Sequence, residues 1–488
     1  MNSLTVILKW LCVLSILPSI TFSQEPYIFS NDKYSGISTV GISPTQPFLN
    51  PNGWDVHLFS ENIFAQNRYI YISETSILGL LKGNIDSANP SAGITGENTA
   101  RVSDYFNYDI TGYHFSNDLM GPSVSFNFTL LNRDFSAGLF TRLRTQSSVI
   151  EADNYLQYTN QEIDEPVLYN LSPFKLNFMN WGEIGLSFSS EIFDYSENVW
   201  IVGGNIKYLM GLDAAFVHNK DDALMRREYE PDPEFPDSLE IKSLYINDFD
   251  IDVGYATNYN FESDSYEFNV RGNGIGIDLG TTMLIPKYKS NDYDLKLSLN
   301  ILDLGYVNFN GNVHNFKGEE LKYVNNAVFD EAEFESPEQY AQIISNEIYG
   351  NQNQSLVARQ FKIGLPTSIH FNASKNIGES QFVNLNLIQR TPLFEYSLKR
   401  SNILNASYSY QKEKFGIGAS ISMYEYENFQ LGGFLRYGPL IIGSENALPF
   451  IVPHKKLHGM DFYIGLKLYP FWENEMTRKS REKCWCDD

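Results

Sequence analysis

The residue types that most often carry catalysis or bind metals are scattered in this chain of 488 residues. His454 and His458 are four positions apart, as two zinc ligands on one helix would be, but no Glu lies between them. Pro453 and Gly459 flank the pair and predict a loop. The chain also has no nucleophile elbow, phosphate-binding loop or paired Cys-x-x-Cys motif. The sequence therefore predicts a protein that is not an enzyme and needs no metal or cofactor.

One glycine-rich run resembles the start of a dinucleotide-binding loop. Such a loop must follow a strand and open a helix. Here, however, the residues after Gly272 keep alternating between small or polar and apolar types. A strand explains the run better, with Ile275, Ile277 and Leu279 facing lipid. The opposite face, predicted to line the lumen, consists of Gly274, Gly276, Asp278 and Gly280. On that face Asp278 would either pair with an Arg or line a polar lumen.

Two cysteines lie in the C-terminal segment 473–488, which we expect to be a periplasmic tail. Cys484 and Cys486 are separated by one residue, a spacing that makes a poor structural disulfide. They could form a periplasmic thiol pair that binds a metal, acts in redox chemistry or cross-links to a partner. The alternative is a frayed terminus. The remaining cysteine, Cys12, falls in the predicted signal peptide.

Charge and composition narrow the class of protein. The net charge of -23 argues against nucleic-acid binding, which needs a basic surface. Acidic residues gather in segments 228–240 and 330–335, which we interpret as solvated loops; the other interpretation, a divalent-cation site, lacks EF-hand spacing. Aromatic residues make up 15% of the chain, yet the mature part has no apolar run long enough for a spanning helix. These features suit a barrel whose strands are apolar on one face only.

The N-terminus predicts export. Residues 1–23 contain Lys9, a short apolar run and Pro18, and Ser23 provides a small residue before a cleavage site. Residues 24–52 are predicted to form a plug-like segment, and residues 53–472 the barrel.

A two-residue rhythm dominates the mature chain. Apolar and polar residues alternate in 123–130, 294–301, 415–423 and 462–469, which predicts strands with one apolar face. With further candidates of the same kind, the sequence predicts an all-β, transmembrane antiparallel β-barrel of about 14 strands. The sheet must close because lipid cannot form hydrogen bonds with the backbone groups of an open sheet edge. Longer excursions are expected at 78–105, 151–171, 221–239 and 313–356, the last with a helix near 337–349.

Several stretches resemble a known group of proteins. They are the GIGIDLG run at 274–280, the LDLGY run at 302–306, the segment 438–446 and the closing strand 461–471. Together they resemble an uncharacterised outer-membrane barrel family of the Bacteroidota, a domain of unknown function, and more distantly the long-chain fatty-acid transporter (FadL-like) barrels. The resemblance implies contact with outer-membrane lipids and insertion by the barrel assembly machinery. It carries no catalytic residues, and the Cys-containing tail departs from it.

Two functions remain open from the sequence. The first is a passive transporter or channel of the cell outer membrane for small molecules, hydrophobic ones included. The second is a non-transporting structural or interaction barrel in an envelope, secretion or motility assembly, with an envelope protein as partner. An open lumen would favour the first function, and a lumen packed with side chains would favour the second.

Overall fold

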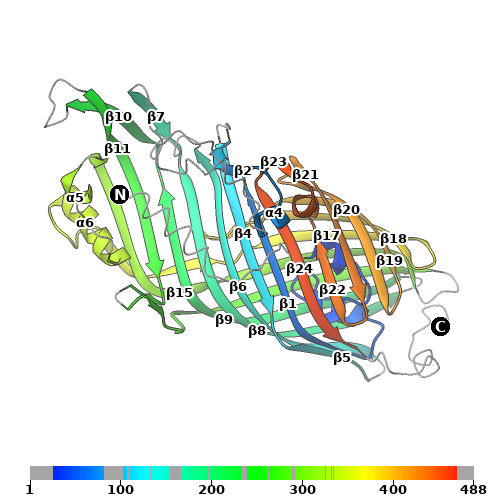
Figure 1. Ribbon diagram of the computed structural model, residues 1–488. Coiled ribbons are helices and arrows are strands. Elements are labelled where there is room, and N and C mark those ends of the chain that lie inside the picture. Colours follow the sequence, from blue (N-terminus) through cyan, green and yellow to red (C-terminus); the bar gives the residue numbers. More distant parts are fainter. Residues whose placement is uncertain are drawn as a thin grey trace.

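The chain folds into a closed antiparallel β-barrel, seen from the side in Figure 1. The computed structural model describes residues 26–81, 103–106, 110–131, 133–153, 166–195, 198–231, 239–261, 263–287, 292–324, 326–330, 332 and 335–469. The predicted signal peptide and the predicted tail with Cys484 and Cys486 lie outside these residues. The barrel closes where the first wall strand pairs with the last, Val56 opposite Leu468.

The wall has fourteen strand positions, so the predicted all-β barrel of about 14 strands is confirmed. Three positions are shared by two successive strands, namely β4 with β5, β11 with β14 and β16 with β17. In chain order the wall strands are β1 (Trp54–Asn67), β4 (Ile110–Met120), β5 (Ser123–Leu130), β6 (Arg133–Asp153), β8 (Phe174–Tyr195), β9 (Asn198–Asn219), β11 (Leu239–Ala256), β14 (Gly272–Pro286), β15 (Tyr293–Val324), β16 (Leu356–Gly364), β17 (Ser368–Gly378), β18 (Gln381–Arg390), β19 (Ile403–Gln411), β20 (Phe415–Tyr424), β21 (Asn428–Tyr437), β22 (Leu440–Ser444) and β24 (Gly459–Leu468).

The alternation places apolar side chains on the outside of the wall. On neighbouring strands, Ile206 of β9 pairs with Ile277 of β14 and with Leu186 of β8, and all three are exposed. The outward apolar belt, defined by its exposed members, includes Leu186, Ile206, Ile275, Ile277, Leu279, Leu299, Val383, Leu385, Leu387, Ile417, Ile421, Leu431 and Leu435. The residues between them are mostly buried, so the wall has an apolar outer face and a polar inner one.

A bulge in β15 changes which residues face inward. Before the bulge the even-numbered residues Ser298 and Asn300 are buried, and after it the odd-numbered Val307 and Phe309 are buried. The register with β14 slips at this point, and Asp303 adopts a left-handed backbone with φ 57°. One extra residue in a strand reverses the alternation beyond it. The bulge therefore turns the Asp303 side chain into the lumen.

The two ends of the barrel differ. At one end most links are turns of a few residues, such as those between β17 and β18 and between β21 and β22. At the other end β11 and β15 extend upward and join β10 (Ala223–Pro231) and β7 (Val167–Leu171) in an extended sheet, at the upper left of Figure 1. The predicted excursions at 221–239 and 313–356 are therefore wrong in part, because β10 forms in the first and β15 runs to Val324 in the second.

Several smaller elements lie outside the wall strands. The predicted helix is α6 (Pro337–Tyr349), which begins at Ser336, whose hydroxyl accepts from the Gln339 N–H, and ends at Gly350 with φ 67°. Packed against it are residues of β10, β11 and β15. The other small elements are β2 (Ile70–Thr75), β3 (Ser103–Tyr105), β12 (Tyr259–Asn260), β13 (Ser265–Tyr266), β23 (His454–Leu457), α4 (Ile77–Leu81), α5 (Ala327–Asp330) and α7 (Leu448–Ile451). No helix in the described part of the chain is long and apolar enough to cross a membrane.

Candidate functional site

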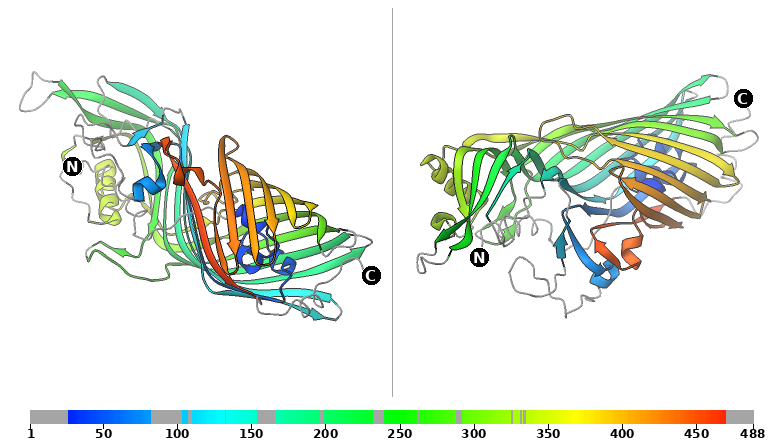
Figure 2. Two further views of the ribbon diagram at one scale, coloured as in Figure 1. Left: turned by 45° about the vertical axis from the view of Figure 1, so that its right-hand side comes forward. Right: turned by 90° about the horizontal axis from the view of Figure 1, so that it is seen from above.

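The N-terminal residues 26–50, which we call the plug, lie inside the barrel. The plug consists of three single-turn helices, α2 (Tyr27–Ser30), η1 (Gly36–Thr39) and α3 (Gln46–Leu49). Figure 2 shows them, in dark blue, enclosed by the wall near the end that carries the short turns. Most plug residues are buried. Helices this short are not stable alone, so the wall must hold the plug in place.

Buried charges tie the plug to the wall. Asp32 of the plug accepts a hydrogen bond from Arg436 Nε of β21 at 3.0 Å. Lys467 of β24 donates to the plug carbonyls of Tyr34 and Ser35 at 2.5 and 2.9 Å, and to the Asp55 carboxylate of β1 at 2.9 Å. A single ammonium group therefore joins the plug, the first wall strand and the last wall strand.

A carboxyl group caps the start of the plug. Glu445, in the loop after β22, accepts a hydrogen bond from the Ile28 N–H at 2.9 Å. Burial and the nearby Asp461 carboxylate raise the pKa of Glu445 well above its usual range. The second carboxyl oxygen, Oε2, is buried and has no hydrogen-bond partner among the described residues. Both observations favour a protonated Glu445 while the plug is docked.

Two paired glycines form a groove for the middle of the plug. Gly203 of β9 lies opposite Gly280 of β14. A Cβ atom on Gly203 would stand 2.6 Å from the Pro44 carbonyl oxygen, and one on Gly280 would stand 3.1 Å from Pro44 Cδ. Beside the groove, the hydroxyls of Thr45 and Thr282 are 2.7 Å apart. The plug backbone therefore packs directly on the wall backbone, which a side chain at either glycine would prevent.

A layer of charged side chains crosses the lumen next to the plug. In this charge layer Lys207 donates to Asp278 at 2.7 Å and to Asp303 at 2.5 Å. Asp303 also accepts from Arg144 at 2.9 Å and from Arg400 at 2.6 Å. The complete layer contains four cations and four carboxylates, namely Arg142, Arg144, Lys207, Arg400, Asp118, Glu183, Asp278 and Asp303. Its charges balance, as burial requires.

Neutral groups complete the hydrogen bonding of this layer. The Asp303 N–H donates to Asp278 at 2.7 Å, and Asn205 Nδ2 donates to the same carboxylate at 2.9 Å. Trp181 Nε1 donates to Glu183 at 2.7 Å, and the Arg144 guanidinium lies over the Trp181 ring at 4.8 Å from its centroid. The layer is therefore a rigid network of ion pairs and hydrogen bonds.

Beyond the charge layer, towards the extended sheet, the lumen is apolar. In this apolar layer the rings of Phe309 and Phe361 stack with centroids 5.6 Å apart, and Phe216 meets Phe361 edge-on at 5.3 Å. The buried members of the apolar layer are Met179, Trp181, Leu209, Ala214, Phe216, Ala256, Val307, Phe309, Val313, Phe361, Ile363, Leu365 and Leu398. Most come from the inner face of wall strands, where a water-filled channel would carry polar residues.

Leu398 belongs to a loop that folds into the lumen. This inward loop, residues 391–402, joins β18 to β19, and yet it reaches strands on the far side of the barrel. The Lys399 N–H donates to Ser148 of β6 at 3.1 Å, and Asn177 of β8 donates to the Ser397 carbonyl at 3.2 Å. At its base, the Leu398 N–H donates to the Gly364 carbonyl at 3.1 Å. Arg400, which pairs with Asp303, also belongs to this loop, so the loop spans the lumen.

The plug, the charge layer and the apolar layer follow one another in that order along the wall. On the inner face of β9, Gly203 and Asn205 contact the plug, Lys207 belongs to the charge layer, and Leu209 and Phe216 belong to the apolar layer. The plug thus closes the lumen near the short turns, while the inward loop closes it nearer the extended sheet.

The structure places the predicted luminal residues as follows. Asp278 is fully buried in the charge layer, with Lys207 as its partner rather than an Arg. Gly276 packs near Lys207 and Leu365, Gly280 faces Pro44, and Gly274 lies close to the Tyr306 carbonyl. His454 and His458 do not meet at one site, because His454 Nδ1 lies 2.6 Å from the Val452 carbonyl and His458 Nδ1 lies 2.6 Å from Gln66 Nε2. The described residues contain no group of three metal-ligating side chains.

Three comparisons with known proteins were informative to different degrees. Residues 96–445 match the profile of a family described as a family of unknown function, DUF5723. No curated protein matches the chain. Among solved structures, a Pseudomonas aeruginosa FadL homologue matches with 7% identity and a TM-score of 0.24, over 92% of this chain and 96% of that one. The Ralstonia pickettii toluene transporter TbuX matches with 8% identity and a TM-score of 0.22, over 89% and 94% of the two chains. TM-scores this low carry no conclusion about what the chain binds.

Proposed function

This chain belongs to DUF5723, a family of unknown function, and from that premise we propose that it is an outer-membrane barrel that passes small molecules through a gated lumen. One observation carries the proposal. The lumen is packed, but part of the packing comes from two segments outside the wall strands, the plug and the inward loop. Both contact the wall through hydrogen bonds, and the plug also contacts it through an ion pair and apolar side chains. Barrels of about eight strands are filled by their own side chains, whereas those of about 16 leave a channel.

The outer face of the wall supports a membrane location. Belt residues such as Ile206, Ile275 and Leu186 are each more than half exposed, at 65%, 64% and 64%. An apolar belt on a closed barrel is stable in lipid, where no sheet edge is left unpaired. Together with the signal-like N-terminus, the belt supports the bacterial outer membrane as the site of action.

The order of the layers suggests a class of solute. A molecule that enters from the extended-sheet end meets the aromatic rings of Phe216, Phe309 and Phe361 before it meets the charge layer. Small apolar or amphipathic molecules would partition into such a layer more readily than ions. The layer therefore supports hydrophobic solutes over salts as the cargo.

The plug and the inward loop close the lumen one behind the other, so the experiment must remove both of them. Protein lacking residues 26–50, protein in which a short Gly-Ser linker replaces residues 393–400, and protein with both changes would be reconstituted in liposomes. We expect slow efflux of small apolar and polar solutes from the wild type and from each single variant, and fast efflux from the double variant.

A double variant that folds into the bilayer, yet leaves efflux at the wild-type rate, would overturn the transport proposal. Circular dichroism and protease resistance of the wall would establish folding. As a matched control, residues 263–270, an exposed segment between β12 and β14, would be replaced in the same way, and this change should leave efflux unchanged because these residues belong to neither closure.

The extended sheet favours a second candidate, an interaction barrel. Beyond the barrel it has an apolar cluster of its own, in which Phe249, Phe316 and Tyr340 pack together. Such a platform is suited to hold a partner protein. Purification in mild detergent tests this candidate. A stoichiometric partner that is lost when residues 326–350 are removed would support it. Recovery of the chain alone would contradict it.

A further inference from the structure

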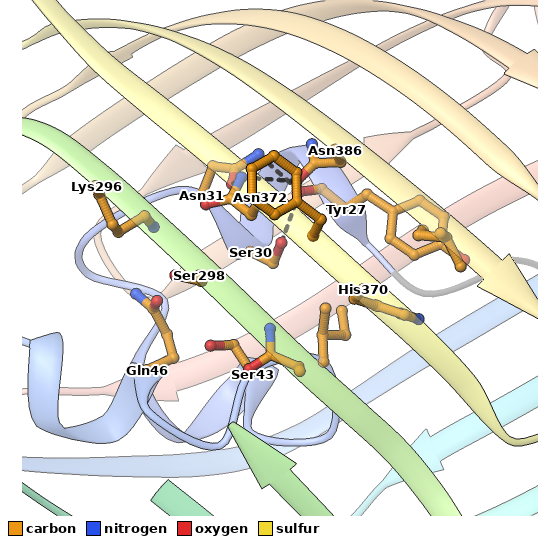
Figure 3. A pocket seen from close by; sticks show the side chains of 14 residues that line it. Tyr27, Ser30, Asn31, Ser43, Gln46, Lys296, Ser298, His370, Asn372 and Asn386 are labelled. Atoms are coloured by element: carbon orange, nitrogen blue, oxygen red, sulfur yellow. Dashed lines mark hydrogen bonds between the residues drawn. The ribbon is translucent and has the colours of Figure 1, made fainter. Parts of the chain in front are cut away.

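A polar cavity lies between the plug and the wall. It is small and partly open to solvent. Plug residues provide one side, including Ser30, Ser43 and Gln46, and β15, β17 and β18 provide the other. Figure 3 shows this arrangement, with Lys296 and Ser298 opposite the plug side chains. The walls carry hydroxyl, amide and imidazole groups, and no carboxylate lines the cavity.

Lys296 is the charged residue of this cavity. Its side chain is buried, with the residue 4% exposed, and Figure 3 shows its ammonium group directed toward the space beside Ser30 and Gln46. Within the described part of the chain, no carboxylate lies within ion-pair distance of it. Its ammonium nitrogen lies over the Tyr293 ring, 5.9 Å from the ring centroid. Asp32, a plug acid close by, is held by Arg436.

Other buried cations of the lumen, unlike Lys296, are paired with carboxylates. Lys207 has two carboxylate partners, Lys467 has Asp55, and Arg400 has Asp303. A buried ammonium without a counter-charge is costly, because burial removes its hydration and nothing replaces it. A bound anion would supply the missing charge.

Nearby groups add hydrogen-bond donors. His370 also lines the cavity, and Arg400 Nη1 donates to its Nε2 at 3.4 Å, which leaves Nδ1 to hold the ring proton. Asn300 is a third lining residue, and its Oδ1 is buried without a partner among the described residues, on the side of Gly280. Its amide nitrogen is free to donate elsewhere. An ammonium group with neutral donors around it is the usual chemistry of an anion site.

We propose that this cavity, which we call the Lys296 site, binds a compact monovalent anion the size of a carboxylate group or a halide. The room for water-sized molecules is small, about one or two waters, so a larger oxyanion would not fit without moving the plug. Since plug and wall share the site, a bound anion would bridge them and hold the plug in place. The inference stands on the cavity and does not require the barrel to transport anything.

Thermal unfolding in detergent micelles tests the site. The apparent Tm of the mature protein would be followed against sodium acetate and, separately, sodium chloride, with ionic strength kept constant by a bulky sulfonate that carries no carboxylate. We expect a rise in Tm that saturates with at least one of the two anions. Saturation with acetate alone would identify a carboxylate as the ligand, and saturation with both would identify a general anion site.

Three variants make the test specific. Lys296→Met should abolish the saturable rise and Lys296→Arg should retain it. Lys375→Met is the matched control, since Lys375 lies on the adjacent strand β17 and is exposed in an ion pair with Asp294, and this variant should respond like the wild type. An equal response in Lys296→Met, or none in the wild type, would overturn the proposal.

A second measurement does not depend on the folding of a variant. Crystals of the wild-type protein grown in bromide would show an anomalous peak beside the Lys296 ammonium nitrogen if the site is as proposed. In a protein whose Tm rises with chloride, a data set with anomalous peaks elsewhere and none at this position would overturn it.

Discussion

Lys207 and Lys296 are both buried on the inner side of the wall, but only Lys207 has carboxylate partners. Lys207→Met would leave Asp278 and Asp303 with one cation fewer, and removing one partner of a buried pair costs about 3–5 kcal/mol. Lys296→Met would instead remove an uncompensated charge, so in anion-free buffer it should keep or raise the stability. Urea unfolding in lipid vesicles would measure both free energies. Equal losses in the two variants would contradict this account of the lumen.

Glu445 gives the plug a dependence on pH. Its pKa in the folded protein is raised by burial and by Asp461, so the docked plug favours the protonated form. The contribution of Glu445 to the stability of the docked plug is therefore fully present below the ordinary pKa of Glu. It is lost as the pH rises through the raised pKa. We expect hydrogen exchange of residues 26–50, corrected for its intrinsic rate, to become faster as the pH rises.

The control for this pH effect is Glu445→Gln, which keeps a carbonyl acceptor for the Ile28 N–H but does not titrate. Its plug should exchange at a corrected rate that hardly changes with pH. A variant with the same pH dependence as the wild type would assign the effect to another group.

At the scale of the elements, the plug stays in place because its backbone packs closely on the wall strands. Gly203 on β9 leaves space for the plug backbone at Pro44, so Gly203→Val should push the plug out of its groove while the wall stays folded. Protease cleavage within residues 26–50 should become at least several-fold faster. The neighbouring Gly204 has its nearest atom at an ordinary 3.4 Å, so Gly204→Ala should leave cleavage at the wild-type rate. Equal rates in the two variants would show that the glycine groove does not seat the plug.

The elements also differ in how well the sequence predicts them. Strict alternation predicts β5 as residues 123–130, the bounds of the structure, because each residue there has one fixed face. The inward loop could not be predicted, since residues 391–402 have the composition of a surface loop and their partners on β6 and β8 are about 250 and 220 residues away. The bulge at Asp303 does leave a signal in the sequence, because Leu302 and Asp303 break the alternation of β15.

At the scale of the whole molecule, the apolar belt decides where the barrel is stable. Ile206 is 65% exposed on the outer face, between Leu186 and Ile277. If this part of the belt lies near the middle of the bilayer, Ile206→Arg should cost about 2–4 kcal/mol. Unfolding in phospholipid vesicles would measure the change, with Ile451→Arg on the loop helix α7 as a control of little effect. A neutral Ile206→Arg would mean that this face does not contact lipid.

The Lys467 ammonium group has a consequence for how the molecule assembles. From the last wall strand it donates to Asp55 of the first wall strand, across the seam where the barrel closes. It also donates to two backbone carbonyls of the plug, which precedes every strand in the chain. The group that ties the last strand to the first therefore also holds the plug. We expect protease protection of the seam and of the plug to develop with the same rate during insertion.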